Sequence, residues 1–366
     1  MTTQIIDTDA IKKDPVFGQI SFDGHEQIVF CNDEDTGLKA IIGIHNTVLG
    51  PALGGTRMWT YKSEWHALND VLRLSRGMTY KSAITGLNLG GGKAVIIGDA
   101  KTQKNDDLMR RFGQFVHSLS GKYITAEDVG METRDMDIIR EVTPHVTGIS
   151  EAKGGSGNPS PVTAYGVYMG MKAATQYVYG SNKLEGKKVL VQGVGHVGET
   201  LVKHITDEGA QVIINDINEQ RLEELSKKYN ANVVLGNDIY GLDIDIYAPC
   251  ALGATINDET INQLNAKVIA GAANNQLADE MKHGRLLKER GIAYAPDFLI
   301  NAGGIINVYA ELEGYSKEES IRKTENIYNT TLEIFELSEK ENITTHRAAF
   351  NIAQNRIDTR KKEQNS

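Results

Sequence analysis

Two lysines and one aspartate in the first half of the chain have the residue types and surroundings of a catalytic site. Lys81 and Lys93 stand 12 residues apart, and Lys93 directly follows the three glycines at 90–92. Glycines leave the backbone bare, so a small molecule could approach that ammonium closely. A lysine buried beside another cation gives up its proton more readily and can serve as an acid or a base. Asp128 follows in AEDVG, where it could shuttle protons or, taken alone, cap a strand end.

A second group of residues has the pattern of a dinucleotide-binding loop. The apolar run 189–191 leads into GVGHVG, and a helical pattern follows at once. In such a loop the first glycine permits a tight turn, the second lets a pyrophosphate approach the backbone, and the third lets the helix pack on the strand. The helix N-terminus then faces the phosphates. The residues expected on the cofactor are Gly193, Val194, Gly195, His196, Val197 and Gly198.

The acid expected to bind the ribose hydroxyls is Asp216. It ends the next apolar run and lies 18 residues after Gly198. A carboxylate at this place repels the extra phosphate of NADP, so the pattern predicts NAD. Arg221, five residues further on, lies in a charged helical stretch and is interpreted as a solvated charge.

These residues must be positioned by two domains, as the length of 366 residues also suggests. The stretch KGGSGNPSP at 153–161 is rich in glycine, serine and proline and marks a linker or hinge. We expect a substrate-binding, catalytic and oligomerisation domain over 1–148 and an NAD-binding domain over 149–343. A C-terminal helix over 344–366 should pack back on the first domain.

The apolar patterns predict an α/β fold throughout. The first domain reads as mixed α/β, with strands at 38–45, 94–97 and 123–126 and helices at 64–78 and 106–119. After the linker, strands at 188–191 and 211–214 alternate with helices at 197–208 and 219–229, and short strands follow near 232, 244 and 268. This alternation predicts a Rossmann-type doubly wound parallel sheet. Helical patterns cover 316–340 and 346–364.

Composition and missing motifs exclude several classes of function. With 39 basic against 48 acidic residues the net charge is −9, so we expect no nucleic-acid partner. No apolar run reaches the roughly 18 residues of a membrane span, and the polar start does not resemble a signal peptide. Cys31 and Cys250 follow no metal-ligand spacing and fit the reducing cytoplasm. The nine histidines form no HxxxH pair, so we expect no metal, and GxSxG is absent.

Seven stretches of the chain carry a family resemblance. PALGGTRM, MTYKSA, LGGGKAV, AEDVG, NPSPVTAYG, GVGHVG and NAGGIINV resemble, in this order, motifs of the glutamate/leucine/phenylalanine/valine dehydrogenase family, most closely those of its leucine-oxidising members. The resemblance covers nearly the whole chain. It implies NAD-dependent, reversible oxidative deamination of an L-amino acid to a 2-oxo acid, ammonia and NADH. It also implies a homo-oligomer, commonly an octamer.

The same resemblance implies roles for single residues. Lys81 would bind the substrate α-carboxylate, Lys93 would be the catalytic lysine that activates water, and Asp128 would shuttle protons. Thr163, Asn274 and Asn301 are similar to family positions near the nicotinamide and the substrate. Their alternatives are an N-cap threonine and loop asparagines.

The resemblance also indicates the substrate. Glutamate dehydrogenases have a lysine where this chain has Leu53, so a second substrate carboxylate would be buried without a partner here. The residues implied around the substrate side chain are Leu53, Gly54, Ala126, Ile305 and Val308. We therefore expect leucine, and also isoleucine and valine, as substrates. A phenylalanine or valine dehydrogenase remains an alternative, as does an NAD-binding regulator without turnover.

Overall fold

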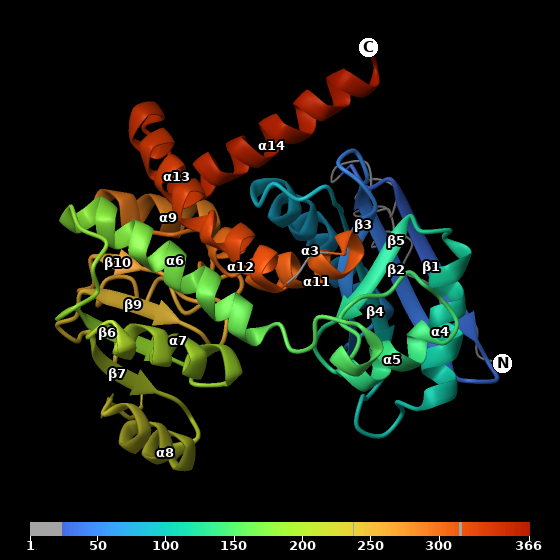
Figure 1. Cartoon of the computed structure of the whole chain (residues 1–366), viewed down its shortest axis with the longest axis horizontal. Helices are drawn as coiled ribbons and strands as arrows, with labels where there is room; N and C mark the ends of the chain where they lie inside the picture. Colours follow the sequence, from blue (N-terminus) through green and yellow to red (C-terminus); the bar gives the residue numbers. More distant parts are fainter. Residues whose placement is uncertain (1–23, 237, 315–316) are drawn as a thin grey trace, which may run out of the picture. The chain divides into compact units, whose positions relative to one another are not determined.

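The computed structural model describes residues 24–236, 238–314 and 317–366. Contacts divide the chain into two compact units (Figure 1). The N-terminal unit contains residues 24–82 and 88–153, and the C-terminal unit contains residues 83–87 and 154–366. The prediction of a two-domain α/β fold is confirmed. The division at 148 and at 343 stays a prediction, and the first 23 residues of the predicted first domain lie outside the described residues.

The N-terminal unit is a mixed five-stranded sheet between helices. Its strands are β1 (Gln27–Asp33), β2 (Leu38–Asn46), β3 (Ala52–Trp59), β4 (Gly90–Ile97) and β5 (Tyr123–Glu127), and its helices are α3 (Glu64–Ile84), α4 (Asp106–Ser118) and α5 (Thr133–Arg140). The strand order is β1-β2-β4-β3-β5. The pairings of β2 with β1 and β4 are antiparallel, whereas β3 lies parallel to both β4 and β5.

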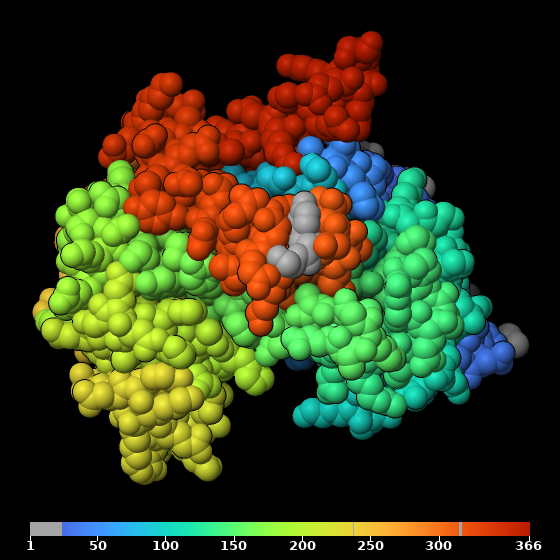
Figure 2. Space-filling view, viewed as in Figure 1, coloured from blue at the N-terminus to red at the C-terminus, as the bar shows by residue number. Residues whose placement is uncertain are grey.

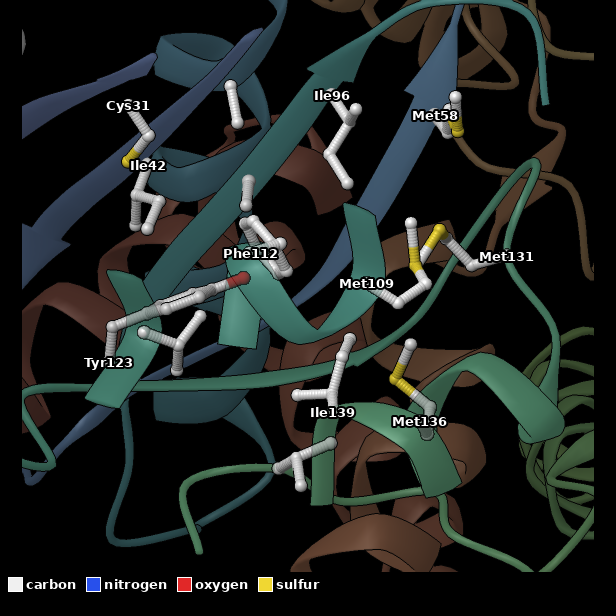
Figure 3. Packing of buried hydrophobic residues seen from close by; sticks show 14 of the residues in the cluster. Cys31, Ile42, Met58, Ile96, Met109, Phe112, Tyr123, Met131, Met136 and Ile139 are labelled. Atoms are coloured by element: carbon white, nitrogen blue, oxygen red, sulfur yellow. The ribbon is translucent and has the colours of Figure 1, made fainter. Parts of the chain in front are cut away.

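Both faces of this sheet are buried because its central strands are apolar on alternate sides. Ile41 and Val95 pack with Leu68 and Val71 of α3 on one face. Neighbouring positions of the same strands face the other side, as the two-residue period of a strand requires. There they form a larger cluster with α4 and α5, which includes Ile42, Ile96, Met109, Phe112, Tyr123, Met136 and Ile139 (Figure 3). Because apolar clusters cover both faces of the sheet, a shift of one residue in strand pairing would exchange the side chains between them, and the register is therefore fixed.

The glycines at 90–92 lie inside β4, and Gly91 among them lets α3 pack against the strand. A Cβ on Gly91 would lie 2.1 Å from Thr79 Oγ1 and 2.2 Å from the Thr79 backbone nitrogen. The hydroxyl of Ser82 donates to the Gly90 carbonyl oxygen at 3.3 Å. The sequence predicts that these glycines let a small molecule approach. At Gly91 the close neighbour is helix α3.

The C-terminal unit is a parallel six-stranded sheet. Its strands are β6 (Lys188–Gln192), β7 (Gln211–Asn215), β8 (Asn232–Val233), β9 (Ile246–Pro249), β10 (Val268–Ile269) and β11 (Ala293–Tyr294). The order β11-β10-β9-β6-β7-β8 places the first strand in the middle, with the later strands wound outward on both sides of it. This is the strand order of dinucleotide-binding folds.

The helices of this unit pack on the sheet or on one another (Figure 1). They are α6 (Ser160–Tyr179), α7 (His196–Asp207), α8 (Glu219–Tyr229), α9 (Glu280–Glu289), α10 (Asp297–Ile300), α11 (Gly303–Glu313), α12 (Lys317–Glu325), α13 (Ile327–Glu341) and α14 (Thr345–Gln364). The short 3-10 turn Glu151–Lys153 precedes α6. Helix α6 contacts α7, α11, α12 and α13. Helix α6 begins at Ser160, inside the predicted linker at 153–161, so the linker is two residues shorter than predicted. Pro161 does not prevent this, because proline is tolerated in the first helical turn.

Helix α14 is buried only over its first part. Ala348, Ala349, Ala353 and Ile357 are buried, whereas the last turns extend from the other helices of the C-terminal unit (Figure 2). The Arg356 guanidinium donates to the carbonyl oxygens of Ala83, Gly86 and Leu87, residues that cluster with this unit. The packing of residues 344–366 on the first domain stays a prediction.

Substituting Gly91 tests the tight packing of α3 on β4. We expect Gly91→Ala to lower the free energy of unfolding of the N-terminal unit by about 3 kcal/mol, because the new methyl meets backbone atoms. Both tryptophans, Trp59 and Trp65, lie in this unit, so urea denaturation followed by tryptophan fluorescence reports on it.

The matched control is Gly77→Ala in the exposed middle of α3. A Cβ on Gly77 has no atom within 4 Å, so this variant should gain up to about 1 kcal/mol of helix stability. Equal stability of the two variants would contradict the packing described here.

Candidate active site

The site in the N-terminal unit is built around a buried ion pair between Lys93 and Asp128. Lys93 lies in β4 with 8% of its side chain exposed, and its ammonium contacts the carboxylate of Asp128, which directly follows β5. Strand β3 runs between these two strands and contributes Gly54 and Gly55 at this level. A Cβ on Gly54 would lie 1.7 Å from the Gly92 carbonyl oxygen, and one on Gly55 would lie 2.9 Å from the Asp128 Cβ. The pair can form because β3 carries no side chain there.

Asp128 is held in its charged form. Burial alone would raise the pKa of its carboxyl, but attraction to Lys93 and Arg57 outweighs burial and lowers that pKa to about 2. Arg57 lies in β3 with its Nε 3.5 Å from Asp128 Oδ2. At neutral pH the centre therefore contains an ionised carboxylate between two basic groups.

Lys81 lies in α3, the helix that packs on β4. It is half-buried in the last turn of the helix, between Thr79 and Ser82, the residues that meet Gly91 and Gly90 of β4. The structure thus brings Lys93 and Asp128 into contact, and it places Lys81 on the helix that packs against the start of β4.

The other predicted residues of this unit line the same strands. Leu53 is 2% exposed and pairs in register with Gly91 of β4 and Ile124 of β5. Gly54 follows it, and Ala126 lies opposite Gly55 and is 7% exposed. These positions are apolar or bare and offer no cation to a second carboxylate.

The glycine loop of the C-terminal unit has the geometry that its sequence predicts. Gly193 has a φ of +95°, and its N–H donates to the Asn215 carbonyl oxygen at 2.7 Å. A Cβ on Gly198 would lie 2.0 Å from the Gly193 carbonyl oxygen, so only glycine fits there. Around Gly195, by contrast, an added Cβ meets no atom within 4 Å. Val194 is buried, whereas His196 and Val197 begin α7, so this open glycine lies at a helix N-terminus.

Asp216 joins this loop to the next strand. Its carboxylate accepts hydrogen bonds from the N–H of Val194 at 2.8 Å and of Asn218 at 3.0 Å. The expectation that Arg221 is a solvated charge is wrong, because its guanidinium pairs with Glu199 in the first turn of α7. Lys228 binds the same carboxylate at 2.9 Å. Arg221 and Lys228 together neutralise the Glu199 carboxylate beside the loop, so that carboxylate does not repel an anionic ligand. The residues present therefore fit an anionic dinucleotide.

The remaining predicted residues lie in α6, before the loop, and in the part of the chain that follows β10. Thr163 is inside α6 and donates to the Pro159 carbonyl oxygen at 3.0 Å, so the N-cap alternative is wrong. Asn301 Nδ2 donates to Asn274 Oδ1 at 2.8 Å, and Asn301 Oδ1 is buried without a hydrogen-bond partner among the described residues. Such an oxygen can accept a hydrogen bond from a bound ligand. Ile305 and Val308, one turn apart on α11, are buried.

Sequence reasoning did not find Arg57 and Asp70. The signal that could have found Arg57 was the arginine of PALGGTRM, directly after the glycines of β3. Within residues 24–236, 238–314 and 317–366, no cluster of three or more histidine, cysteine, aspartate or glutamate residues could hold a metal ion. In the same ranges no helix has the length and apolar character of a membrane span.

Comparison with known proteins identifies the family. Residues 25–145 match the dimerisation domain of Glu/Leu/Phe/Val dehydrogenases, and residues 154–218 and 214–365 match the Glutamate/Leucine/Phenylalanine/Valine dehydrogenase domain. The chain is 58% identical to a leucine dehydrogenase of Bacillus subtilis (91% of this chain, 92% of that protein) and 46% identical to a phenylalanine dehydrogenase of Caldalkalibacillus thermarum (94% of each). The crystal structure of L-tryptophan dehydrogenase from Nostoc punctiforme matches with a TM-score of 0.84 and 45% identity, over 95% of this chain and all of that one. The chain therefore belongs to the glutamate/leucine/phenylalanine/valine dehydrogenase family and is an amino acid dehydrogenase, of a family that uses a nicotinamide cofactor.

Proposed function

We propose that this enzyme is an NAD-dependent leucine dehydrogenase, which reversibly converts leucine, isoleucine and valine to 2-oxo acids, ammonia and NADH. The observation that carries the proposal is the buried Lys93–Asp128 pair, which can exchange protons with a substrate nitrogen and with water. The likeness to curated leucine dehydrogenases supports the choice of substrate.

The proposed roles follow from charge and position. The Lys81 ammonium binds the substrate carboxylate and so orients Cα. The Asp128 carboxylate takes a proton from the substrate ammonium. When bound, the nicotinamide supplies the acceptor for the hydride that leaves Cα. Asp128 releases the proton of the substrate ammonium to solvent. A water molecule held at Lys93 then attacks the resulting iminium carbon and gives one proton to the Lys93–Asp128 pair, which passes it to the amino group. As the C–N bond breaks and ammonia leaves, the pair takes the remaining hydroxyl proton and the 2-oxo acid forms.

The proposed cofactor is NAD. The loop residues Gly193, Val194, Gly195, His196, Val197 and Gly198 would hold the pyrophosphate at the N-terminus of α7. Asp216 would bind the ribose hydroxyls and repel a 2′-phosphate. Thr163, Asn274 and Asn301 would lie near the nicotinamide or the substrate, where Asn301 Oδ1 offers a free acceptor among the described residues.

The proposed side-chain pocket is aliphatic. In the N-terminal unit, Leu53, Gly54 and Ala126 would contact the substrate side chain. The family resemblance proposes Ile305 and Val308 of α11 as further substrate-binding residues. Because one methylene changes binding by only about 1 to 3 kcal/mol, the enzyme should discriminate weakly among the three branched-chain substrates. An aromatic amino acid is the second candidate substrate, favoured by the phenylalanine and tryptophan dehydrogenases among the relatives.

We further propose a homo-oligomer in the cytoplasm. The match of residues 25–145 to a dimerisation domain supports self-association, and the octamer implied by family resemblance is the proposed form. The two cysteines are free thiols, which suits a reducing compartment.

A substrate panel tests the proposal. NADH formation is followed at alkaline pH with leucine, isoleucine, valine, phenylalanine and glutamate in separate reactions, each with NAD and with NADP. We expect turnover of the three aliphatic amino acids with NAD and little turnover of glutamate, because Leu53 provides no charge for a second carboxylate. Preferential oxidation of phenylalanine would contradict the pocket, and equal rates with NADP would contradict the role of Asp216.

Substituting Gly195 tests the cofactor loop. Gly195→Ala should fold normally, since a Cβ there meets no protein atom, but should weaken NAD binding at least about tenfold because the methyl occupies space needed by the pyrophosphate. Isothermal titration calorimetry measures the affinity. Gly241→Ala is the matched control, an exposed glycine of the same unit that is equally uncrowded. Unchanged NAD affinity in Gly195→Ala would place the cofactor elsewhere.

A further inference from the structure

The mechanism proposed above leaves Arg57 without a role, although it touches the catalytic carboxylate. Arg57 lies in β3 with 24% of its side chain exposed. Its Nη1 donates to Asp70 Oδ2 of α3 at 2.9 Å, and the Tyr61 hydroxyl donates to the same oxygen at 2.7 Å. One guanidinium thus connects Asp128 beside β5 to Asp70 on α3.

Arg57 forms an ion pair with Asp128, but the two groups are too far apart for a good hydrogen bond. Arg57 Nε and Asp128 Oδ2 are 3.5 Å apart, and Arg57 Nε is buried without a hydrogen-bond partner among the described residues, whereas Asp128 Oδ2 also contacts the Lys93 ammonium. Asp70 anchors the other side of the guanidinium, so the Nε–H stays directed at the carboxylate region. Hydrogen bonds of catalytic groups are often long before substrate binds and tighten in the complex.

The charges around Asp128 show what the arginine adds. Lys93 approaches it from β4 and Arg57 from β3, and Asp70, with Arg73 at 3.4 Å, completes the group from α3. A lysine that takes part in proton transfer changes its charge during turnover. An arginine does not, because it stays protonated at any working pH. Arg57 therefore provides a constant positive charge beside Asp128, whereas the other cation beside Asp128, Lys93, changes its charge during turnover.

We propose that Arg57 is a positioning residue that holds the Asp128 carboxylate in place and returns it to its charged form between proton transfers. The inference rests on the proposed roles of Lys93 and Asp128. Arg57 acts through Asp128, with Asp70 fixing the guanidinium. Its constant charge also favours the charged form of the Asp128 carboxylate and so helps to lower the pKa of that carboxyl.

The test compares Arg57→Gln, which removes the charge, with Arg57→Lys, which keeps it. Arg57→Gln should reduce kcat for the best amino acid substrate by up to about 100-fold and leave the Kd of NAD unchanged. The acid limb of its pH profile for oxidative deamination should move up by about one pH unit or more, because the Asp128 carboxyl then binds its proton more tightly. Arg57→Lys should bring the acid limb most of the way back to its wild-type position, while its kcat stays below that of the wild type.

Arg111→Gln is the matched control. Arg111 is an arginine of α4 in the same unit, and its Nε pairs with Asp33 at 2.8 Å without contact to Lys93 or Asp128. This variant should keep the wild-type kcat and pH profile. A shift of the acid limb in Arg111→Gln equal to that in Arg57→Gln would show a general loss of charge or order and would overturn the assignment.

The outcome separates this inference from the proposed function. The panel of amino acids identifies the best substrate, so an aromatic substrate refutes the leucine proposal and still allows the Arg57 comparison. Wild-type kcat and pH profile in Arg57→Gln refute the role of Arg57 alone. Carbon NMR titration of Asp128 in wild type and both variants gives a readout without turnover, and identical titrations would refute the role as well. If Arg57→Gln fails to fold, a wild-type kcat in Arg57→Lys refutes it.

Discussion

The ion pair between Lys93 and Asp128 is the interaction on which the chemistry of this enzyme depends. Two charges taken out of water are stable only when their geometry is good and further groups compensate them. Here Arg57 supplies a second cation to the carboxylate, and Asp70 in turn pairs with that cation. The alternation of charges lets a lysine and an aspartate stay buried together in an α/β unit whose surroundings are apolar on both faces.

The backbone arrangement around the pair follows from the same need. Lys93 and Asp128 come from strands that flank β3, and they meet only because β3 has glycines at this level. Glycine weakens a strand, so its use in a central strand requires compensation. The two apolar clusters on the faces of the sheet provide it. In the C-terminal unit the same logic recurs, since glycines of the loop after β6 bring backbone and helix together and leave one open position.

The sequence predicted the dinucleotide loop better than the catalytic centre. The loop is a local structure, in which glycine spacing, the preceding strand and Asp216 lie within one strand-helix-strand unit, so the pattern determined the elements from β6 to α8 almost to the residue. The lysines and Asp128 were found as residue types, and their roles came from family resemblance. That Lys93 and Asp128 form a pair depends on the strand order, which no local pattern contains. β3 was missed because glycines are depleted in strands, and α6 because its first turn contains a proline. Arg57 and Asp70 acquire significance only through tertiary contacts.

The most direct test of the central claim is a double-mutant cycle on kcat with Lys93→Ala, Asp128→Asn and the combined variant, with NAD affinity measured for each. Groups that act as one unit lose their contribution together. We therefore expect both single variants to lose nearly all turnover, the double variant to be no slower than the slower single one, and NAD affinity to be unchanged in all three. Near-normal turnover of Lys93→Ala, or losses that multiply in the double variant, would contradict a catalytic centre built on this pair.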